Sequence, residues 1–343
     1  MGVNIRDLVK PTPISFEELN NKVIAIDAYN ALYQFLSIIR QYDGMPLIDK
    51  NNNITSHLSG LFYRTINLIE NGVKPVYVFD GKPPSLKIDT IKAREEVRKE
   101  SQEKWSLAVE AGDYEGAKKY AQASSALTKD MVEESKTLLK LMGVPFIEAP
   151  SEGEAQAAYM NMKGDVWACA SQDWDSLLFG AHRLVRNLTV SGRRKLPGKQ
   201  VYIKVEVELV TLEQVLKDNN ITRDQLIDIG ILVGTDYNEG VKGIGPKSAL
   251  NLIRKHGSIE KVLENEGIEF NQPLEEIRRL FKNPDVTDNY TLHWSPPKEE
   301  QIIELLNVKH DFSLDRVKAA LDRIREYGKT KPQSRLDQYF TAG

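Results

Sequence analysis

The chain has 343 residues, 28% of them charged and 41% hydrophobic, and a formal net charge of -3. This composition is typical of a globular protein with ample length for a core, and it excludes binding to nucleic acid through overall charge alone. The single cysteine excludes an internal disulfide, and no apolar run is long enough to span a bilayer. We therefore expect an intracellular protein without a membrane partner.

Two short apolar runs near the start of the chain each lead to an aspartate. Residues 23–26 precede Asp27, and residues 76–79 precede Asp80, with helical spacing between the two runs. Strands that alternate with helices predict a parallel α/β sheet. Ligands of such sheets bind at the carboxyl ends of the strands, so we expect both aspartates at one edge.

The next segment is rich in Lys, Arg and Glu. Helical spacing predicts helices over 91–110 and 117–141 with a glycine-containing turn between them. This pattern indicates a helical hairpin inserted between two halves of the sheet, with Lys87, Lys92, Arg94 and Arg98 near its base. A solvated charged helix face is the alternative, but the position just after Asp80 favours contact with phosphate.

Two acidic pairs follow, separated by an apolar run that predicts a buried strand. Ser151 before the first pair predicts a helix N-cap, with Glu154 three residues later as in a capping box and Glu152 between them. Asp173 and Asp175 follow the predicted strand, and in extended chain they would point to the same side. Alternatively, the first pair only complements a helix dipole and the second consists of solvated turn residues.

Six carboxylates would then meet at one edge of the sheet: Asp27, Asp80, Glu152, Glu154, Asp173 and Asp175. Such a cluster repels itself and raises its own pKa values unless cations neutralise it. Oxygen-only ligands favour Mg²⁺ or Mn²⁺, whereas five scattered histidines and one cysteine give no zinc spacing. Chance convergence of these acids is the alternative.

Two later stretches carry signs of phosphate binding. Between residues 182 and 204 there are seven basic residues and no acidic one, including Arg193, Arg194 and Lys195. This run indicates a phosphate-facing surface, with a solubilising loop as the alternative.

A glycine-rich turn follows a helix that ends near Asp236, a seventh acid. Gly243 and Gly245 permit positive φ and close backbone approach, and Lys247 lies at the start of the next helix. The setting is that of a helix-hairpin-helix, which grips one DNA backbone without reading bases.

The polar end of the chain contains exposed apolar residues, with Gln333, Leu336, Tyr339 and Phe340 in one short segment. Because these side chains have no core to join, we expect a docking peptide.

With these motifs in view, the chain resembles the flap endonucleases of the XPG-type 5′ nuclease superfamily over nearly its whole length. The motifs that carry the resemblance are Ile26-Asp27-Ala28-Tyr29-Asn30-Ala31, Pro75-Val76-Tyr77-Val78-Phe79-Asp80-Gly81-Lys82-Pro83-Pro84, Glu152-Gly153-Glu154-Ala155, Asp173-Trp174-Asp175, Gly234-Thr235-Asp236-Tyr237 and Gly243-Ile244-Gly245-Pro246-Lys247.

The resemblance implies a site for two Mg²⁺ ions, which Mn²⁺ can replace. Their ligands would be Asp27, Asp80, Glu152, Glu154, Asp173, Asp175 and Asp236. It also implies that Lys87 and Arg94 reach the scissile phosphate, and that the helical hairpin is the arch that admits a 5′ flap. Gly2 resembles the family's processed N-terminus near the active site.

Other contacts are implied by the same resemblance. Tyr33 would stack on a base, Thr55 and Arg64 would grip a one-nucleotide 3′ flap, and the tail segment would bind the sliding clamp, PCNA. Because the chain stops just after that segment, without the basic extension of eukaryotic relatives, we expect an archaeal source and a cytoplasmic or nucleoid location.

We expect a mostly parallel sheet flanked by helices, in one nuclease domain over residues 1–328. Its parts are an N-terminal part at 1–98, the arch at about 86–128, an internal part at about 116–258 with the helix-hairpin-helix at 223–257, and C-terminal helices at 259–328, before a flexible tail at 329–343. The expected function is 5′ flap endonuclease, with 5′-3′ exonuclease activity, in replication and repair by a protein that is monomeric alone. The alternatives are a non-catalytic DNA-junction binding protein, a Mg²⁺-dependent phosphatase, or a related exonuclease or junction resolvase.

Overall fold

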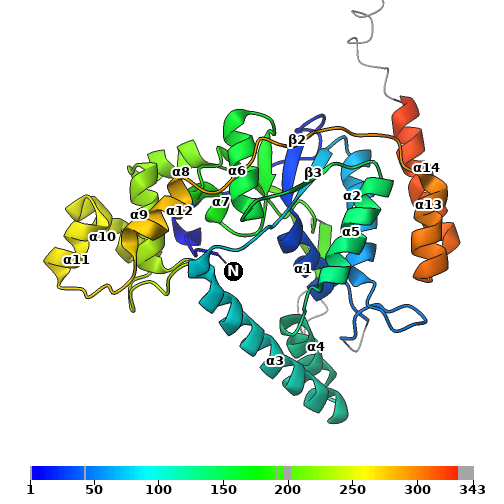
Figure 1. Ribbon diagram of the computed structural model, residues 1–343, viewed down its shortest axis with the longest axis horizontal. Coiled ribbons are helices and arrows are strands. Elements are labelled where there is room, and N and C mark those ends of the chain that lie inside the picture. Colours follow the sequence, from blue (N-terminus) through cyan, green and yellow to red (C-terminus); the bar gives the residue numbers. More distant parts are fainter. Residues whose placement is uncertain (1, 42–43, 191, 196–201, 331–343) are drawn as a thin grey trace, which may run out of the picture.

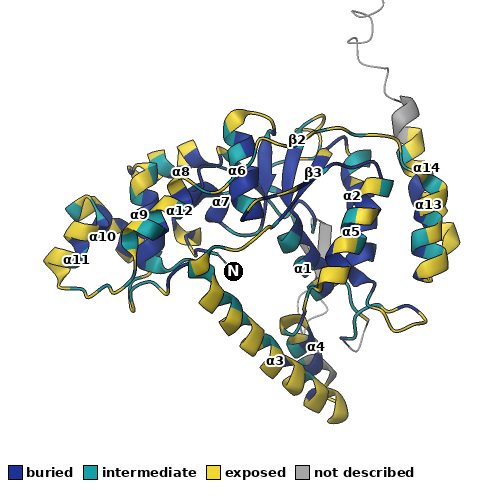
Figure 2. Cartoon of the chain, viewed as in Figure 1, coloured by how far each residue is buried: buried dark blue, intermediate teal, exposed yellow. Residues whose placement is uncertain are grey.

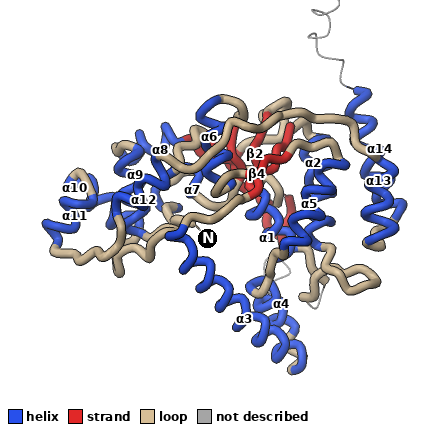
Figure 3. The backbone as a smooth tube through the Cα atoms, in the orientation of Figure 1, coloured by secondary structure: helices blue, strands red, loops and turns tan. Residues whose placement is uncertain are grey.

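The computed structural model describes residues 2–41, 44–190, 192–195 and 202–330. A seven-stranded sheet lies at its centre, flanked by helices (Figure 3), which confirms the predicted α/β class. Across the sheet the strands are β1 (Thr12–Pro13), β9 (Glu208–Thr211), β6 (Arg183–Arg186), β5 (Ala168–Ala170), β2 (Val23–Asp27), β3 (Lys74–Phe79) and β4 (Phe146–Glu148).

Strands β6, β5, β2, β3 and β4 run parallel to one another. On the side of β6, strand β9 pairs antiparallel with β6, and β1 pairs antiparallel with β9 at the edge. In this register Ile26 of β2 lies between Tyr77 of β3 and Ala170 of β5. The strands that lead to Asp27 and Asp80 are therefore neighbours of the same direction. Their carboxyl ends meet at one edge, as the sequence predicts.

Each face of the sheet is covered by its own set of helices (Figure 1), because successive strand residues point to opposite faces. Ile24, Ile26 and Tyr77 pack in the core on one face, and Ala25 and Val76 in the core on the other. The first face carries α1 (Ala28–Ile38), α2 (Ser56–Glu70), α5 (Lys129–Leu141), α13 (Glu299–Ile303), the π-helical segment η3 (Glu304–Lys309) and α14 (Leu314–Thr330). The second carries the short 3-10 helix η1 (Arg6–Leu8), α6 (Gly153–Lys163), α7 (Asp175–Leu178), α8 (Leu212–Asn219) and α9 (Arg223–Val233).

The predicted helical hairpin projects from the body and is largely exposed (Figure 2). It consists of α3 (Ile88–Glu110), preceded by the short 3-10 helix η2 (Ser85–Lys87), and α4 (Tyr114–Ala123). The prediction of one helix over 117–141 is wrong. Thr128 caps a new helix, α5, by accepting a hydrogen bond from the Met131 amide at 3.2 Å, and α5 packs on the sheet rather than in the hairpin.

The helix-hairpin-helix lies at the far end of the second face (Figure 1). Three further helices build this end: α10 (Pro246–His256), α11 (Ile259–Glu266) and α12 (Leu274–Lys282). The basic run forms a separate antiparallel hairpin of β7 (Gly192–Lys195) and β8 (Tyr202–Val205). No helix of the described residues is long and apolar enough to cross a membrane.

The C-terminal helix α14 continues to Thr330, past the expected end of the domain at residue 328. The predicted clamp-binding residues Gln333, Leu336, Tyr339 and Phe340 lie outside the described residues.

Candidate active site

Asp27 and Asp80 are placed by the ends of adjacent strands. Asp27 is the last residue of β2 and the N-cap of α1, where its carboxylate accepts a hydrogen bond from the Asn30 amide at 3.0 Å. Asp80 follows β3 directly, and its Oδ1 accepts from the Gly153 amide at 2.7 Å. This second bond ties the end of β3 to the first turn of α6, which carries the next two acids.

Glu152 and Glu154 flank the start of α6, but the predicted capping box is wrong. The N-cap position belongs to Glu152, not Ser151, and the Glu152 side chain makes no capping hydrogen bond. Glu152 instead contacts the Tyr237 hydroxyl and the Lys87 ammonium. Glu154 accepts a hydrogen bond from the Ser171 hydroxyl at 2.6 Å. Both acids therefore turn towards the strand edge rather than towards their own helix.

Asp173 and Asp175 do not lie in extended chain, so the prediction that they project from one strand is wrong. Strand β5 ends at Ala170, and Trp174 already has helical backbone angles ahead of α7, which begins at Asp175. Asp173 accepts a hydrogen bond from the Asn30 amide side chain at 3.1 Å. Asp175 accepts from the Val3 amide at 2.7 Å. The loop and the helix start still deliver both acids to the same edge.

The carboxylates interact with one another in a buried setting. Burial raises the pKa of Asp27, and the nearby charges of Asp80 and Asp173 raise it further. Burial likewise raises the pKa of Glu154, with added repulsion from Asp175. Burial is also the first cause of the raised pKa values of Asp80 and Glu152. For Asp175, burial and the charge of Asp236 raise the pKa to about 7. This edge therefore holds more negative charge than its surroundings neutralise.

Two cations at the base of the arch neutralise part of this charge. Lys87 Nζ contacts Glu152 Oε1 and lies 3.2 Å from Asp236 Oδ2. Arg94 Nη2 contacts the other oxygen of Asp236. Although burial opposes its charge, Lys87 and Arg94 lower the pKa of Asp236. The Thr90 hydroxyl donates to the Asp236 carbonyl at 2.8 Å and so fixes the first turn of α3 beside the acids.

The donor set fits hard divalent cations, because every candidate ligand is a carboxylate. Among residues 2–41, 44–190, 192–195 and 202–330, no three His, Cys, Asp or Glu side chains are arranged closely enough to hold a metal ion. In this structure the Lys87 ammonium contacts both Glu152 and Asp236. Cationic side chains take up carboxylate oxygens that a metal would need.

The candidate contacts for DNA near the arch differ in exposure. The Tyr33 ring lies under the Arg98 guanidinium, whose central carbon is 5.0 Å from the ring centroid. Thr55 is buried at 4% exposure and ends the loop before α2. Arg64 is half-buried within α2, where burial lowers its pKa. None of these three belongs to the acidic cluster.

The helix-hairpin-helix residues lie in an open turn. Gly243 has a φ of +86°, whereas Gly245 has a φ of -91° and is the N-cap of α10, so only Gly243 adopts the positive φ that both glycines permit. A Cβ added at Gly245 would meet no atom within 4 Å. Lys247 is exposed and lies 3.8 Å from Asp7. Arg193, Arg194 and Lys195 form strand β7, whose side chains are outside the description.

Several residues that support the acids were not singled out by the sequence. Asn30 contacts both Asp27 and Asp173, Ser171 holds Glu154, and the Tyr237 hydroxyl contacts Glu152. Asn30 and Tyr237 lie within the quoted motifs, so their position next to an acid was the available signal. Thr90 carried no such signal, because its contact depends on how the arch meets the body.

Comparison with known proteins shows to which family the chain belongs. The XPG N-terminal domain model matches residues 1–101, and the XPG I-region model matches residues 143–236. Flap endonuclease 1 of Methanosarcina barkeri is 54% identical over 99% of this chain and 100% of its own length. The chain belongs to the flap endonuclease family.

Three further comparisons, one with a relative and two with solved structures, agree with this assignment. Flap endonuclease 1 of Pyrococcus furiosus is 54% identical over 99% of each chain. The solved flap endonuclease-1 from Methanococcus jannaschii is 48% identical, with a TM-score of 0.77, over 96% of this chain and all of its own. The catalytic core of Rad2 in complex with a DNA substrate is 25% identical, with a TM-score of 0.69, over 92% of this chain and 96% of its own.

Proposed function

We propose that the chain is a structure-specific 5′ flap endonuclease, with 5′-3′ exonuclease activity, that acts on branched DNA in replication and repair. The observation that carries the proposal is the gathering of Asp27, Asp80, Glu152, Glu154, Asp173, Asp175 and Asp236 around the base of an arch. A module that only binds DNA gains nothing from buried carboxylates that repel phosphate. Full-length identity to flap endonucleases supports the same function.

These seven carboxylates would hold two Mg²⁺ ions, which Mn²⁺ can replace. When bound, such ions generate a hydroxide nucleophile and stabilise the leaving oxygen of a phosphodiester. The protein positions the acids through the amides of Asn30, Gly153 and Val3 and the hydroxyl of Ser171. Some acids would act through water, because Mg²⁺ keeps part of its hydration shell.

Lys87 and Arg94 would serve as the catalytic cations. Both lie at the base of the arch and are paired with carboxylates of the site. A phosphodiester entering this edge offers them a new anionic partner, so they would exchange a carboxylate for the scissile phosphate. The resulting stabilisation of charge in the transition state acts on kcat.

The DNA on either side of the scissile bond would be held by weaker contacts. Tyr33 would stack on a base, Thr55 and Arg64 would receive the 3′ flap, and Gly243, Gly245 and Lys247 would grip one backbone with Arg193, Arg194 and Lys195 nearby. The segment with Gln333, Leu336, Tyr339 and Phe340 would bind the sliding clamp, PCNA. The enzyme would act as a monomer inside the cell, and Phe340→Ala should remove clamp stimulation while basal cleavage persists.

The deciding experiment is cleavage of an end-labelled double-flap DNA by the wild type, Asp175→Asn and Asp130→Asn, each in Mg²⁺ and in EDTA. Asp130 is an exposed acid in the first turn of α5 and supplies a matched control. We expect incision at the flap base in Mg²⁺ only, abolished in Asp175→Asn while DNA binding persists, and unchanged in Asp130→Asn. Binding without incision under every metal condition would leave a junction-binding protein instead.

A further inference from the structure

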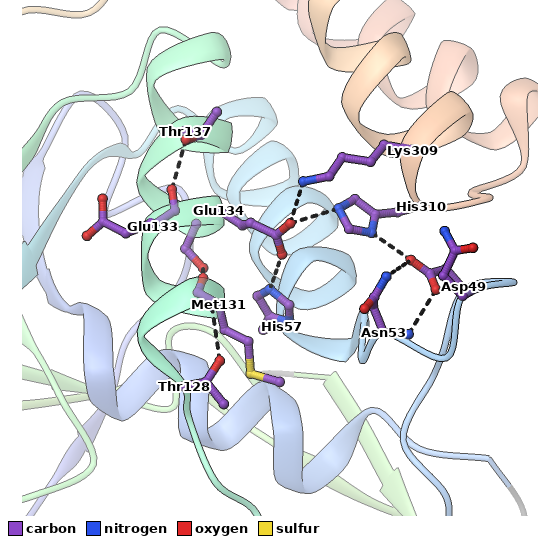
Figure 4. Close-up of polar contacts among 12 residues, drawn as sticks. Asp49, Asn53, His57, Thr128, Met131, Glu133, Glu134, Thr137, Lys309 and His310 are labelled. Atoms are coloured by element: carbon purple, nitrogen blue, oxygen red, sulfur yellow. Dashed lines mark hydrogen bonds and ion pairs between the residues drawn. The ribbon is translucent and has the colours of Figure 1, made fainter.

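A second cluster of titratable side chains lies among the helices that cover the first face of the sheet (Figure 4). We call the cluster the latch and define it as Asp49, His57, Glu134, Lys309 and His310. Its members come from the loop before α2, from α2, from α5 and from the end of η3. The latch therefore joins the C-terminal helices to three parts of the nuclease body: the loop before α2, α2 and α5.

His310 is the centre of the latch. Its Nδ1 lies 3.0 Å from Asp49 Oδ2, and its Nε2 lies 3.1 Å from Glu134 Oε1. Carboxylate oxygens only accept hydrogen bonds, so both contacts are hydrogen bonds only when both ring nitrogens carry a proton. In the neutral imidazole one ring nitrogen would turn a lone pair towards a carboxylate oxygen, and His310 is only 3% exposed. The geometry favours the imidazolium.

The surroundings of Asp49 and Glu134 favour the ionised form of both carboxylates. Burial opposes the charge of Asp49, but hydrogen bonds from Asn53 and His310 outweigh it and hold its pKa below the ordinary value. Contact with His57 and with the Lys309 ammonium lowers the pKa of Glu134 to about 2. Both acids therefore stay ionised in mildly acidic solution, and the His310 ring lies between them.

The other titratable side chains near His310 are His57, Lys309, Lys50 and Asp311. The His57 ring is fully buried, with Nε2 3.6 Å from Glu134 Oε2. Lys309 Nζ lies 2.7 Å from Glu134 Oε1, and beyond Asp49 the exposed Lys50 and Asp311 pair at 3.2 Å. Within the described residues the basic side chains that face Glu134 are thus those of Lys309, His57 and His310.

The loop that carries Asp49 leads directly into Thr55. Asp49 Oδ1 accepts hydrogen bonds from the Asn51 and Asn53 amides at 2.8 and 2.9 Å, and the Thr55 amide donates to the Leu47 carbonyl at 2.8 Å. The Asp49 carboxylate thus stabilises the loop by accepting hydrogen bonds from its amides, and His310 contacts the same carboxylate from outside the loop.

We propose that His310 is a positioning residue whose imidazolium fastens the loop at residues 44–55 and helix α5 to the C-terminal helices, and that loss of its proton releases them. The part that concerns DNA rests on the proposed function, in which Thr55 receives the 3′ flap. A released loop would weaken binding of that flap without touching the reacting phosphate. The stability that the latch contributes is present in mildly acidic solution and is lost as the pH rises.

The test compares the thermal unfolding of the full chain at about pH 6 and about pH 9, on either side of the usual range of imidazole titration. The variants are His310→Gln, which cannot carry the charge, and His310→Lys, which carries it at both pH values. His293→Gln makes the same change at an exposed histidine. Asp49→Asn tests the other end of the contact and serves where His310→Gln gives no folded protein.

We expect His310→Gln to lower Tm by on the order of 5 °C at pH 6 and by less than half as much at pH 9. The gap between wild type and His310→Lys should move in favour of the lysine variant as the pH rises, while His293→Gln follows the wild type throughout. An equal Tm loss for His310→Gln at both pH values, or no loss at either, would overturn the latch.

A kinetic measurement separates the latch from the proposed function. On a double-flap substrate with a one-nucleotide 3′ flap, His310→Gln should raise KM several-fold at pH 6 and leave kcat within two-fold. A normal KM together with the Tm trend would overturn the positioning role alone. Absence of cleavage by every form, wild type included, would overturn the proposed function and leave the Tm result standing.

Discussion

Replacing Lys87 with methionine should separate two roles of this residue. In the DNA-free protein its ammonium pairs with carboxylates of the site, and during cleavage it would contact the scissile phosphate. The ammonium lies 3.2 Å from Asp236 Oδ2, and at an effective dielectric constant of about 20 this attraction amounts to about 5 kcal/mol. Desolvation of the side chain, which is 18% exposed, offsets most of that gain. If the net attraction of Lys87 for Glu152 and Asp236 is about 1.4 kcal/mol, its removal would let these two carboxylates bind a divalent cation about ten-fold more tightly.

The expected outcome for Lys87→Met is therefore tighter metal binding together with slower cleavage. Calorimetric titration with Mn²⁺ in the absence of DNA should show the lower Kd, and single-turnover cleavage at saturating metal should fall by roughly 100-fold. Lys82→Met is the matched control, since Lys82 is an exposed lysine of the same segment. Metal binding that is unchanged or weaker in Lys87→Met would refute the view that the ammonium competes for the carboxylates.

Three further changes test the supports of the site and fold. Gly2→Ala places a Cβ against the Asp175 carboxylate, so kcat should fall about ten-fold while Tm stays within about 2 °C of wild type; equal kcat would contradict the contact. Asp228→Asn weakens the buried pair with Arg278, joined at 2.8 Å, and should lower the free energy of unfolding in urea by about 3 kcal/mol. Asp224→Asn, in the exposed pair with Lys282, should lower it by under about 1 kcal/mol. Similar losses for the two variants would refute the argument. Gly60→Ala drives a Cβ into the Phe35 ring and should cost about 1–3 kcal/mol by the same assay, whereas a gain in stability would show that the ring moves aside.

The sequence by itself determined the sheet and the acids on it. Apolar runs that end on Asp27 and Asp80, with a helical pattern between them, favour parallel strands buried on both faces. Their carboxyl ends then have to share an edge, so the position of both aspartates followed from local pattern alone. The family resemblance extended this prediction to Asp236, which lies in a turn rather than at the end of a strand.

Local pattern failed where a competing partner lay far away in the sequence. Ser151 and Glu154 have the spacing of a capping box, but Glu154 accepts a hydrogen bond from Ser171 on the neighbouring loop instead. Asp175 starts a helix because the chain turns directly after Asp173, and the Val3 amide meets its carboxylate from 172 residues away.

Only the tertiary structure decided which charges neutralise one another. Lys87 reaches Asp236 across 149 positions, and His310 reaches Asp49 across 261. Neither pairing has a signature in sequence, because an ion pair depends on distance in space and on burial, whereas periodicity reports only which face of an element is apolar. The strands thus set Asp27 and Asp80, whereas the fold of the arch against the sheet decides which cations neutralise the acids of the site.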